Sequence, residues 1–98
     1  MAVAVEMNFK GATLDQYDQV AALMGHTPGG PTPPHAISHW VAQTNDGIRV
    51  VDVWDSQAEY EKFAQEQIGP YAAQAGFPGA PEVTFTEVHN YLTAPPAS

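Results

Sequence analysis

The order of strand-like and helix-like segments limits this chain to very few folds. Residues 3–9 alternate between two kinds of side chain with a period of two, which predicts a first strand. A helix is expected over residues 14–24, because Thr13 and Gln16 form a capping-box pattern and the apolar residues that follow have helical spacing. Gly25 is the expected end of this helix, since glycine readily adopts the left-handed conformation found there.

Three further segments complete the pattern. Residues 36–43 and 48–54 are rich in β-forming side chains and flank an Asn-Asp-Gly turn, which predicts a hairpin. A second capping box at Ser56 predicts another helix, and residues 82–92 are expected to form a last strand. The order β-α-β-β-α-β is typical of the ferredoxin-like α+β fold, a four-stranded antiparallel sheet with two helices on one face.

Length and composition fit one domain. With 98 residues, of which 44% are hydrophobic and 14% charged, the chain is long enough to bury a packed core. We expect residues 1–93 to form a single domain and residues 94–98, a Pro/Ala segment, to be a flexible tail.

The charge balance excludes several classes of partner. Eleven acidic residues against three basic ones give a net charge of −8, which disfavours nucleic acid and anionic membrane surfaces. The absence of cysteine excludes disulfides, thiolate metal sites and a cysteine nucleophile. No apolar run approaches the roughly 20 residues of a membrane span, and residues 1–6 lack a basic leader, so we expect a cytoplasmic protein. No phosphate-binding loop is present, and we expect no cofactor.

A loop rich in proline and glycine separates the first helix from the hairpin. Residues 26–34 contain four prolines and two glycines, which exclude a helix or a central strand there. Because long ordered loops are usually functional, we predict that this segment is a lid over the mouth of a pocket.

The hairpin register predicts a histidine beside a carboxylate. A turn over residues 44–47 places His39 opposite Asp52 and Ile37 opposite Trp54, all on one side of the sheet. A carboxylate that holds one ring nitrogen fixes the tautomer of the imidazole and makes it a stronger base, as acid–base catalysis requires. The alternative is a purely structural hydrogen-bonded pair.

The same pattern makes a prediction about the two faces of the sheet. We expect the helices to cover the side that carries Trp40, with Phe63 in the core beside it, and to leave the His39–Asp52 side bare. A bare face as apolar as this one should be covered by a partner, most simply a second copy of the chain. The sequence thus predicts a homodimer that encloses a barrel lined by His39 and Asp52.

The segment from Val50 to Tyr60 (VVDVWDSQAEY), a strand that ends in Trp and runs directly into a capped helix, resembles the dimeric α/β barrel superfamily. The resemblance is strongest to its antibiotic-biosynthesis-monooxygenase-like group. It implies a homodimer with a pocket between sheet and helices. Some members oxidise polyketide-like aromatic molecules without a bound cofactor, and others are binders. Trp54 and Tyr60 match positions that line the pocket in cofactor-free members, whereas the Asn and Arg that often accompany them are absent here.

Four more residues are candidates for substrate binding. Glu6 is expected to point inward near Asp52, and a solvent-exposed Glu6 fits the pattern equally well. His89 and Tyr91 share one side of the last strand, although the sequence leaves open which side faces the pocket. His35 shares parity with His39, but strand positions four apart lie about 13 Å from each other, too far for one metal ion. We therefore predict no metal site.

Two functions fit these residues. The first is a small cofactor-independent enzyme of secondary metabolism, a monooxygenase, cyclase or isomerase in which His39 and Asp52 transfer protons to or from an aromatic or polyketide-like substrate. The second is a non-catalytic dimeric barrel that binds such a ligand or acts in a stress response.

Overall fold

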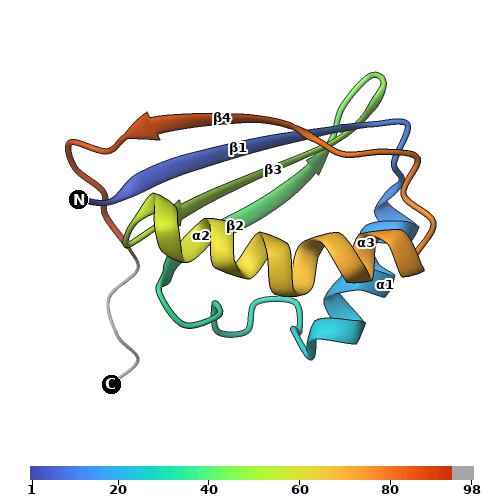
Figure 1. The fold of residues 1–98 in the computed structure, drawn as a ribbon, viewed down its shortest axis with the longest axis horizontal. Helices are drawn as coiled ribbons and strands as arrows, with labels where there is room; N and C mark the ends of the chain where they lie inside the picture. Colours follow the sequence, from blue (N-terminus) through green and yellow to red (C-terminus); the bar gives the residue numbers. More distant parts are fainter. Residues whose placement is uncertain (94–98) are drawn as a thin grey trace.

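The computed structural model describes residues 1–93, and the tail predicted over residues 94–98 lies outside the described part. Figure 1 shows a sheet whose long strands lie across one layer of helices. The sheet has the strand order β2-β3-β1-β4 and every neighbouring pair is antiparallel. The elements in chain order are β1 (Val3–Lys10), α1 (Leu14–Met24), β2 (Ala36–Gln43), β3 (Gly47–Trp54), α2 (Gln57–Phe63), the π-helical turn η1 (Ala64–Ile68), α3 (Gly69–Gln74) and β4 (Glu82–Glu87).

This architecture is the ferredoxin-like α+β fold, and the predicted fold class is confirmed. The first helix begins as predicted, because the Thr13 hydroxyl accepts from the Gln16 backbone N–H and the Gln16 side chain accepts from the Thr13 backbone. It ends at Gly25, whose φ of 76° is left-handed. No helix within residues 1–93 is long and apolar enough to cross a membrane.

The last strand is shorter than predicted. It ends at Glu87 instead of Leu92, because its neighbour β1 begins at Val3, which pairs with Glu87. One further backbone bond, from the Val88 N–H to the Ala2 carbonyl, closes the ladder. A strand needs a hydrogen-bonding neighbour, so the chain leaves the sheet at that point.

The predicted assignment of the two faces is wrong. The helices cover the side that carries Val5, Met7, Ile48 and Trp54, all of which are fully buried, whereas Trp40 on the other side is 50% exposed. The reason lies in β1, whose apolar residues pair with the β3 residues of the His39–Asp52 side. The apolar sides of the two central strands together form the surface on which the helices pack.

The hairpin register is confirmed over most of its length. His39 lies opposite Asp52 and Val41 opposite Val50, as predicted. At the start of β2 an irregularity between Ala36 and Ser38 shifts the pairing, so that Ala36, and not Ile37, lies opposite Trp54.

Candidate active site

A continuous chain of side-chain hydrogen bonds links α1, β2 and β3. The Nδ1 atom of His39 lies 2.6 Å from the Asp52 Oδ1 atom. The other ring nitrogen, Nε2, is hydrogen-bonded to the hydroxyl of Tyr17 on α1. At the far end the indole N–H of Trp54 donates to Asp52 Oδ2 at 3.1 Å. We call these four residues the relay.

The partners fix the direction of each bond. An indole N–H can only donate, and a carboxylate accepts at both oxygens, so the Nδ1 atom of His39 carries the proton that lies towards Asp52. In the neutral imidazole the Nε2 atom is then the acceptor for the Tyr17 O–H. In this neutral form His39 is a base whose Nε2 lone pair points at a phenol.

Burial decreases along the relay. Trp54 is 1% exposed and Asp52 5%, whereas the His39 side chain is 34% exposed. The Trp54 ring is packed against Tyr60 and Phe63, with centroids 5.9 and 5.1 Å away. The carboxylate therefore lies in the core and the imidazole at its boundary.

Both phenols near the carboxylate are weakened as acids. Burial, followed by the charges of Asp52 and Asp18, raises the pKa of Tyr17. Burial, followed by Asp52 and Glu61, raises the pKa of Tyr60 to about 12. Tyr17 consequently remains protonated at neutral pH and acts as a hydroxyl.

The relay opens into a cavity of about 610 Å³ between the sheet, the helices and the loop of residues 26–33. Tyr17, His39 and Asp52 contribute polar atoms to its lining, which is otherwise largely apolar. Volumes of about 300–1,000 Å³ are typical of sites for small organic ligands. The proline- and glycine-rich loop forms part of the wall, consistent with its predicted place at the pocket.

A second histidine, His26, also lines this cavity. It directly follows the Gly25 cap of α1, and its ring is nearly parallel to that of Phe63, with a centroid distance of 6.5 Å. Burial, followed by the charge of a protonated His39, lowers the pKa of His26, while Asp52 opposes this.

Two of the residues predicted to bind substrate lie behind the cavity wall. Trp54 and Tyr60 belong to the buried core, where Tyr60 also contacts Phe85 of β4 edge to face. They support Asp52 and the helix layer.

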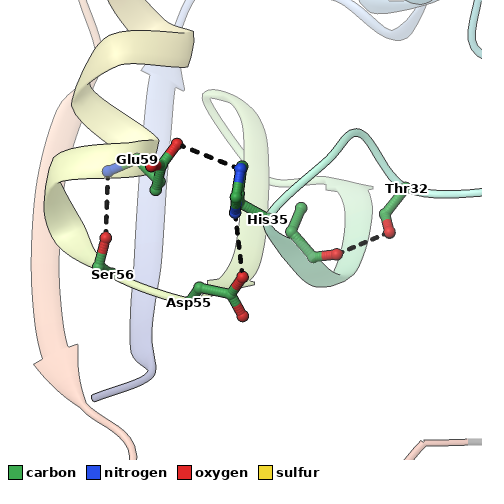
Figure 2. A network of polar contacts seen from close by, with 6 residues as sticks. Thr32, His35, Asp55, Ser56 and Glu59 are labelled. Atoms are coloured by element: carbon green, nitrogen blue, oxygen red, sulfur yellow. Dashed lines mark hydrogen bonds and ion pairs between the residues drawn. The ribbon is translucent and has the colours of Figure 1, made fainter.

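His35 belongs to a separate cluster at the end of the loop (Figure 2). Its Nδ1 atom lies 3.3 Å from Asp55 and its Nε2 atom 3.7 Å from Glu59, so the ring bridges the loop to the start of α2. The backbone N–H of Asp55 donates to the His35 carbonyl, and the φ of His35 is 72°, left-handed for a residue with a side chain. This cluster fastens one end of the loop to the scaffold.

The remaining candidates lie away from the relay. Glu6 pairs with Val51, on the opposite side of the sheet from Asp52, so the inward position beside that carboxylate is wrong and the alternative of an exposed Glu6 holds. There it accepts from Asn8 and lies 3.9 Å from Arg49. His89 and Tyr91 are exposed beyond the end of β4, because the strand ends at Glu87. Within residues 1–93 no group of three or more His, Asp or Glu side chains is arranged to hold a metal ion.

Sequence reasoning missed two residues of the cavity, Tyr17 and His26. Tyr17 lies among the regularly spaced apolar residues of α1 that pack against the sheet. This spacing could have predicted its place, because a helix that covers the His39 side of the sheet brings Tyr17 to the imidazole. His26 follows a helix-terminating glycine, which fixes its position relative to α1.

By sequence, the chain matches no protein-family model and no curated protein. By structure, it is similar to a protein of Chloroflexus aurantiacus provisionally named an antibiotic biosynthesis monooxygenase, with 22% identity, a TM-score of 0.61, and 93% of this chain and 97% of that one covered.

Two proteins of Streptomyces share the fold as well. The ActVA-Orf6 monooxygenase of Streptomyces coelicolor, solved with nanaomycin D, has 19% identity and a TM-score of 0.53, with 96% of this chain and 92% of that one covered. SnoaB of Streptomyces nogalater, a cofactor-independent oxygenase, has 14% identity and a TM-score of 0.55, with 95% and 96% covered. The chain therefore has the fold of the antibiotic-biosynthesis-monooxygenase-like proteins.

Proposed function

We propose that this protein is a cofactor-independent enzyme that transfers a proton between His39 and an aromatic or polyketide-like substrate bound in the cavity. The observation that carries the proposal is the relay, in which a neutral imidazole with a buried carboxylate behind it reaches the wall of a largely apolar cavity. Apolar walls favour a hydrophobic substrate, and convergent polar groups at one place favour chemistry there.

The proposed step moves one proton through Tyr17. The substrate gives a proton to the Tyr17 oxygen while the Tyr17 hydroxyl proton passes to His39 Nε2, and an imidazolium and a substrate anion result. The nearby carboxylate of Asp52 stabilises the imidazolium charge. Because burial and Asp52 raise the pKa of Tyr17, the phenol transfers the proton without remaining an anion.

Oxygenation is the subsequent reaction that the structural neighbours favour. Those neighbours include a cofactor-independent oxygenase and a monooxygenase solved with nanaomycin D. A carbanion formed at a CH₂ group beside an aromatic ketone is electron-rich and can reduce O₂ directly. The carbanion forms a C–O bond with O₂, and the resulting peroxide anion takes the proton held on His39. Loss of the remaining C–H proton with cleavage of the O–O bond then gives the C=O group and water.

The test uses anthrone, a three-ring aromatic ketone with an acidic CH₂ group. We expect the wild-type protein to accelerate O₂ consumption, measured with an oxygen electrode, and the formation of anthraquinone, measured by absorbance. His39→Ala and Asp52→Asn should each lower the rate by about 10²–10⁴-fold, the usual contribution of acid–base catalysis. Folded variants that keep the wild-type rate would refute the proposal, and a wild-type protein that binds anthrone without turnover would indicate a binding protein.

We also infer that the protein forms a homodimer through the helix-free face of its sheet. Trp40 is half exposed on this face, beside the partly buried Val51 and Val53. These three residues form an apolar strip on a face that also carries Glu6, Asn8 and Arg49. Such a strip, left uncovered by the chain's own helices, is most simply buried by a symmetric copy. Analytical ultracentrifugation at micromolar concentration should give twice the chain mass of 10.5 kDa, and Trp40→Asp should give the single mass. A wild-type monomer would contradict the inference.

A further inference from the structure

The cavity contains two imidazoles, and the proposed proton transfer uses only one of them. His26 follows the Gly25 cap of α1 and His39 lies on β2, and both line the same space. We propose that His26 is a second hydrogen-bonding group for the substrate, so that the cavity selects planar aromatic molecules with two oxygen functions, one held at Tyr17 and His39 and the other at His26. This inference rests on the proposed function and specifies its substrate class.

The backbone holds His26 in a defined place. Gly25 adopts the left-handed conformation, its N–H donates to the Ala22 carbonyl at 3.0 Å, and the His26 N–H donates to the Ala21 carbonyl at 2.9 Å. These bonds close the C-terminal end of α1 with the geometry of a helix cap. The His26 ring lies within 7° of parallel to the ring of Phe63 on α2. Contact with Phe63 on one face of the ring favours this orientation of the ring plane.

The chemistry of this ring suits a neutral oxygen function. His26 makes no side-chain hydrogen bond within residues 1–93, so its nitrogens are available to a ligand. Burial and His39 lower the pKa of His26, which keeps the ring neutral at pH 7, with one N–H donor and one acceptor. A neutral imidazole can donate to a carbonyl or accept from a phenol. The charged and titratable groups that act on it are His39 of β2 and Asp52 of β3.

The size of the cavity fits an organic ligand of the proposed class. A volume of about 610 Å³ is within the range of about 300–1,000 Å³ that accommodates drug-sized ligands. Most of the remaining lining is apolar, although Asp18, Thr27, Thr32 and Asp52 also belong to it. The two imidazoles and Tyr17 are therefore among the few groups that can distinguish one aromatic skeleton from another by its oxygen atoms.

The test compares two probes, 1-naphthol with one oxygen and 5-hydroxy-1,4-naphthoquinone with a phenol and carbonyls. The chain has no cysteine, so the quinone meets no thiol with which to react. Affinities are measured by isothermal titration calorimetry with the full chain. We expect the dissociation constant of 1-naphthol divided by that of the naphthoquinone to fall by about tenfold in His26→Phe, which is the effect of one well-made hydrogen bond. His26→Gln, which keeps a donor and an acceptor, should restore part of the ratio.

The comparison of ratios cancels any general change of the pocket. Affinities for both probes that fall equally in His26→Phe, or a ratio that does not change, would overturn the inference, and so would a wild-type protein that binds neither probe. Circular dichroism confirms that each variant is folded, and His26→Gln is the conservative test if His26→Phe is not. The assay measures no turnover, so its failure is distinct from that of the anthrone assay, which depends on His39 and Asp52.

Discussion

Replacing Asp52 by Asn should reverse the direction of the relay while leaving the fold intact. The amide has one oxygen and one nitrogen where the carboxylate has two acceptors. Because the Trp54 N–H can only donate, the amide oxygen must remain on Trp54, and the amide nitrogen then faces His39 Nδ1. His39 has to accept at Nδ1 in the variant, so its proton moves to Nε2, the atom that accepts from Tyr17 in the wild-type protein.

The expected effects follow from the bonds that change. A hydrogen bond to a charged group contributes about 1.5–3 kcal/mol and a neutral one about 0.5–1.5 kcal/mol. The variant exchanges two charged bonds, those of His39 and Trp54, for neutral ones, so we expect the free energy of unfolding to fall by about 2–3 kcal/mol. Proton transfer should slow by about 10²–10⁴-fold, because Nε2 no longer offers a lone pair. Removal of the Asp52 charge should also lower the pKa values of Tyr17 and Tyr60, since that charge helps to raise both.

Three measurements check these effects on one sample. Nitrogen-15 NMR reports which ring nitrogen of His39 is protonated, urea unfolding gives the free energy, and absorbance at alkaline pH follows tyrosine ionisation. Asp52→Ala is the matched comparison, because it leaves the Trp54 N–H without a partner and should cost about 2–4 kcal/mol. An Asp52→Asn protein in which Nε2 stays unprotonated, or in which anthrone turnover is unchanged, would refute this account of the relay.

Three further predictions concern stability. Because the pKa of Tyr60 is raised to about 12, its neutral form stabilises the fold below pH 10.0, and this contribution is lost as the pH rises towards 12. Tyr60→Phe should reduce the alkaline loss of stability, measured by urea unfolding, by no more than about 2 kcal/mol. The pKa of His26 is lowered, so its effect on stability has the opposite pH dependence: its contribution is present above pH 6.5 and is lost as the pH falls below that value. The free energy of unfolding should therefore fall less between pH 7 and pH 5 in His26→Phe than in the wild type. Gly47→Ala would place a Cβ 2.0 Å from the Phe9 carbonyl oxygen, and we expect about 3 kcal/mol of destabilisation by thermal unfolding; an unchanged midpoint would contradict the close approach.

The sequence was sufficient to pair His39 with Asp52. A hairpin with a definite turn has one register, and the period of two then fixes which side chains lie together whatever covers them. The same reasoning failed at Ile37, because a strand irregularity depends on the local backbone and leaves no mark in the alternation of side chains.

The choice of face could not be made from the hairpin alone. Both sides of the hairpin carry apolar residues, among them Trp40 on one and Trp54 on the other, so each side could have received the helices. The decision comes from β1, which is inserted between β3 and β4 and places Val5 and Met7 next to the Asp52 side. The pattern of the hairpin alone does not contain this neighbour of β3. The position of Tyr17 over His39 depends on it, because it decides which side of the sheet the helices cover.

The gradient of burial along the relay separates the requirements of stability from those of chemistry. Asp52 is satisfied by Trp54 and His39, so a charge within the core is compatible with a stable fold, while His39 and Tyr17 lie where a ligand can reach them. Changes at the buried end should therefore affect unfolding and proton transfer together, whereas Tyr17→Phe should mainly affect transfer, because it removes a hydroxyl at the cavity wall and no core contact of Asp52. A Tyr17→Phe protein with wild-type anthrone turnover would mean that the substrate reaches His39 Nε2 directly, with the imidazole and carboxylate as the whole acid–base system.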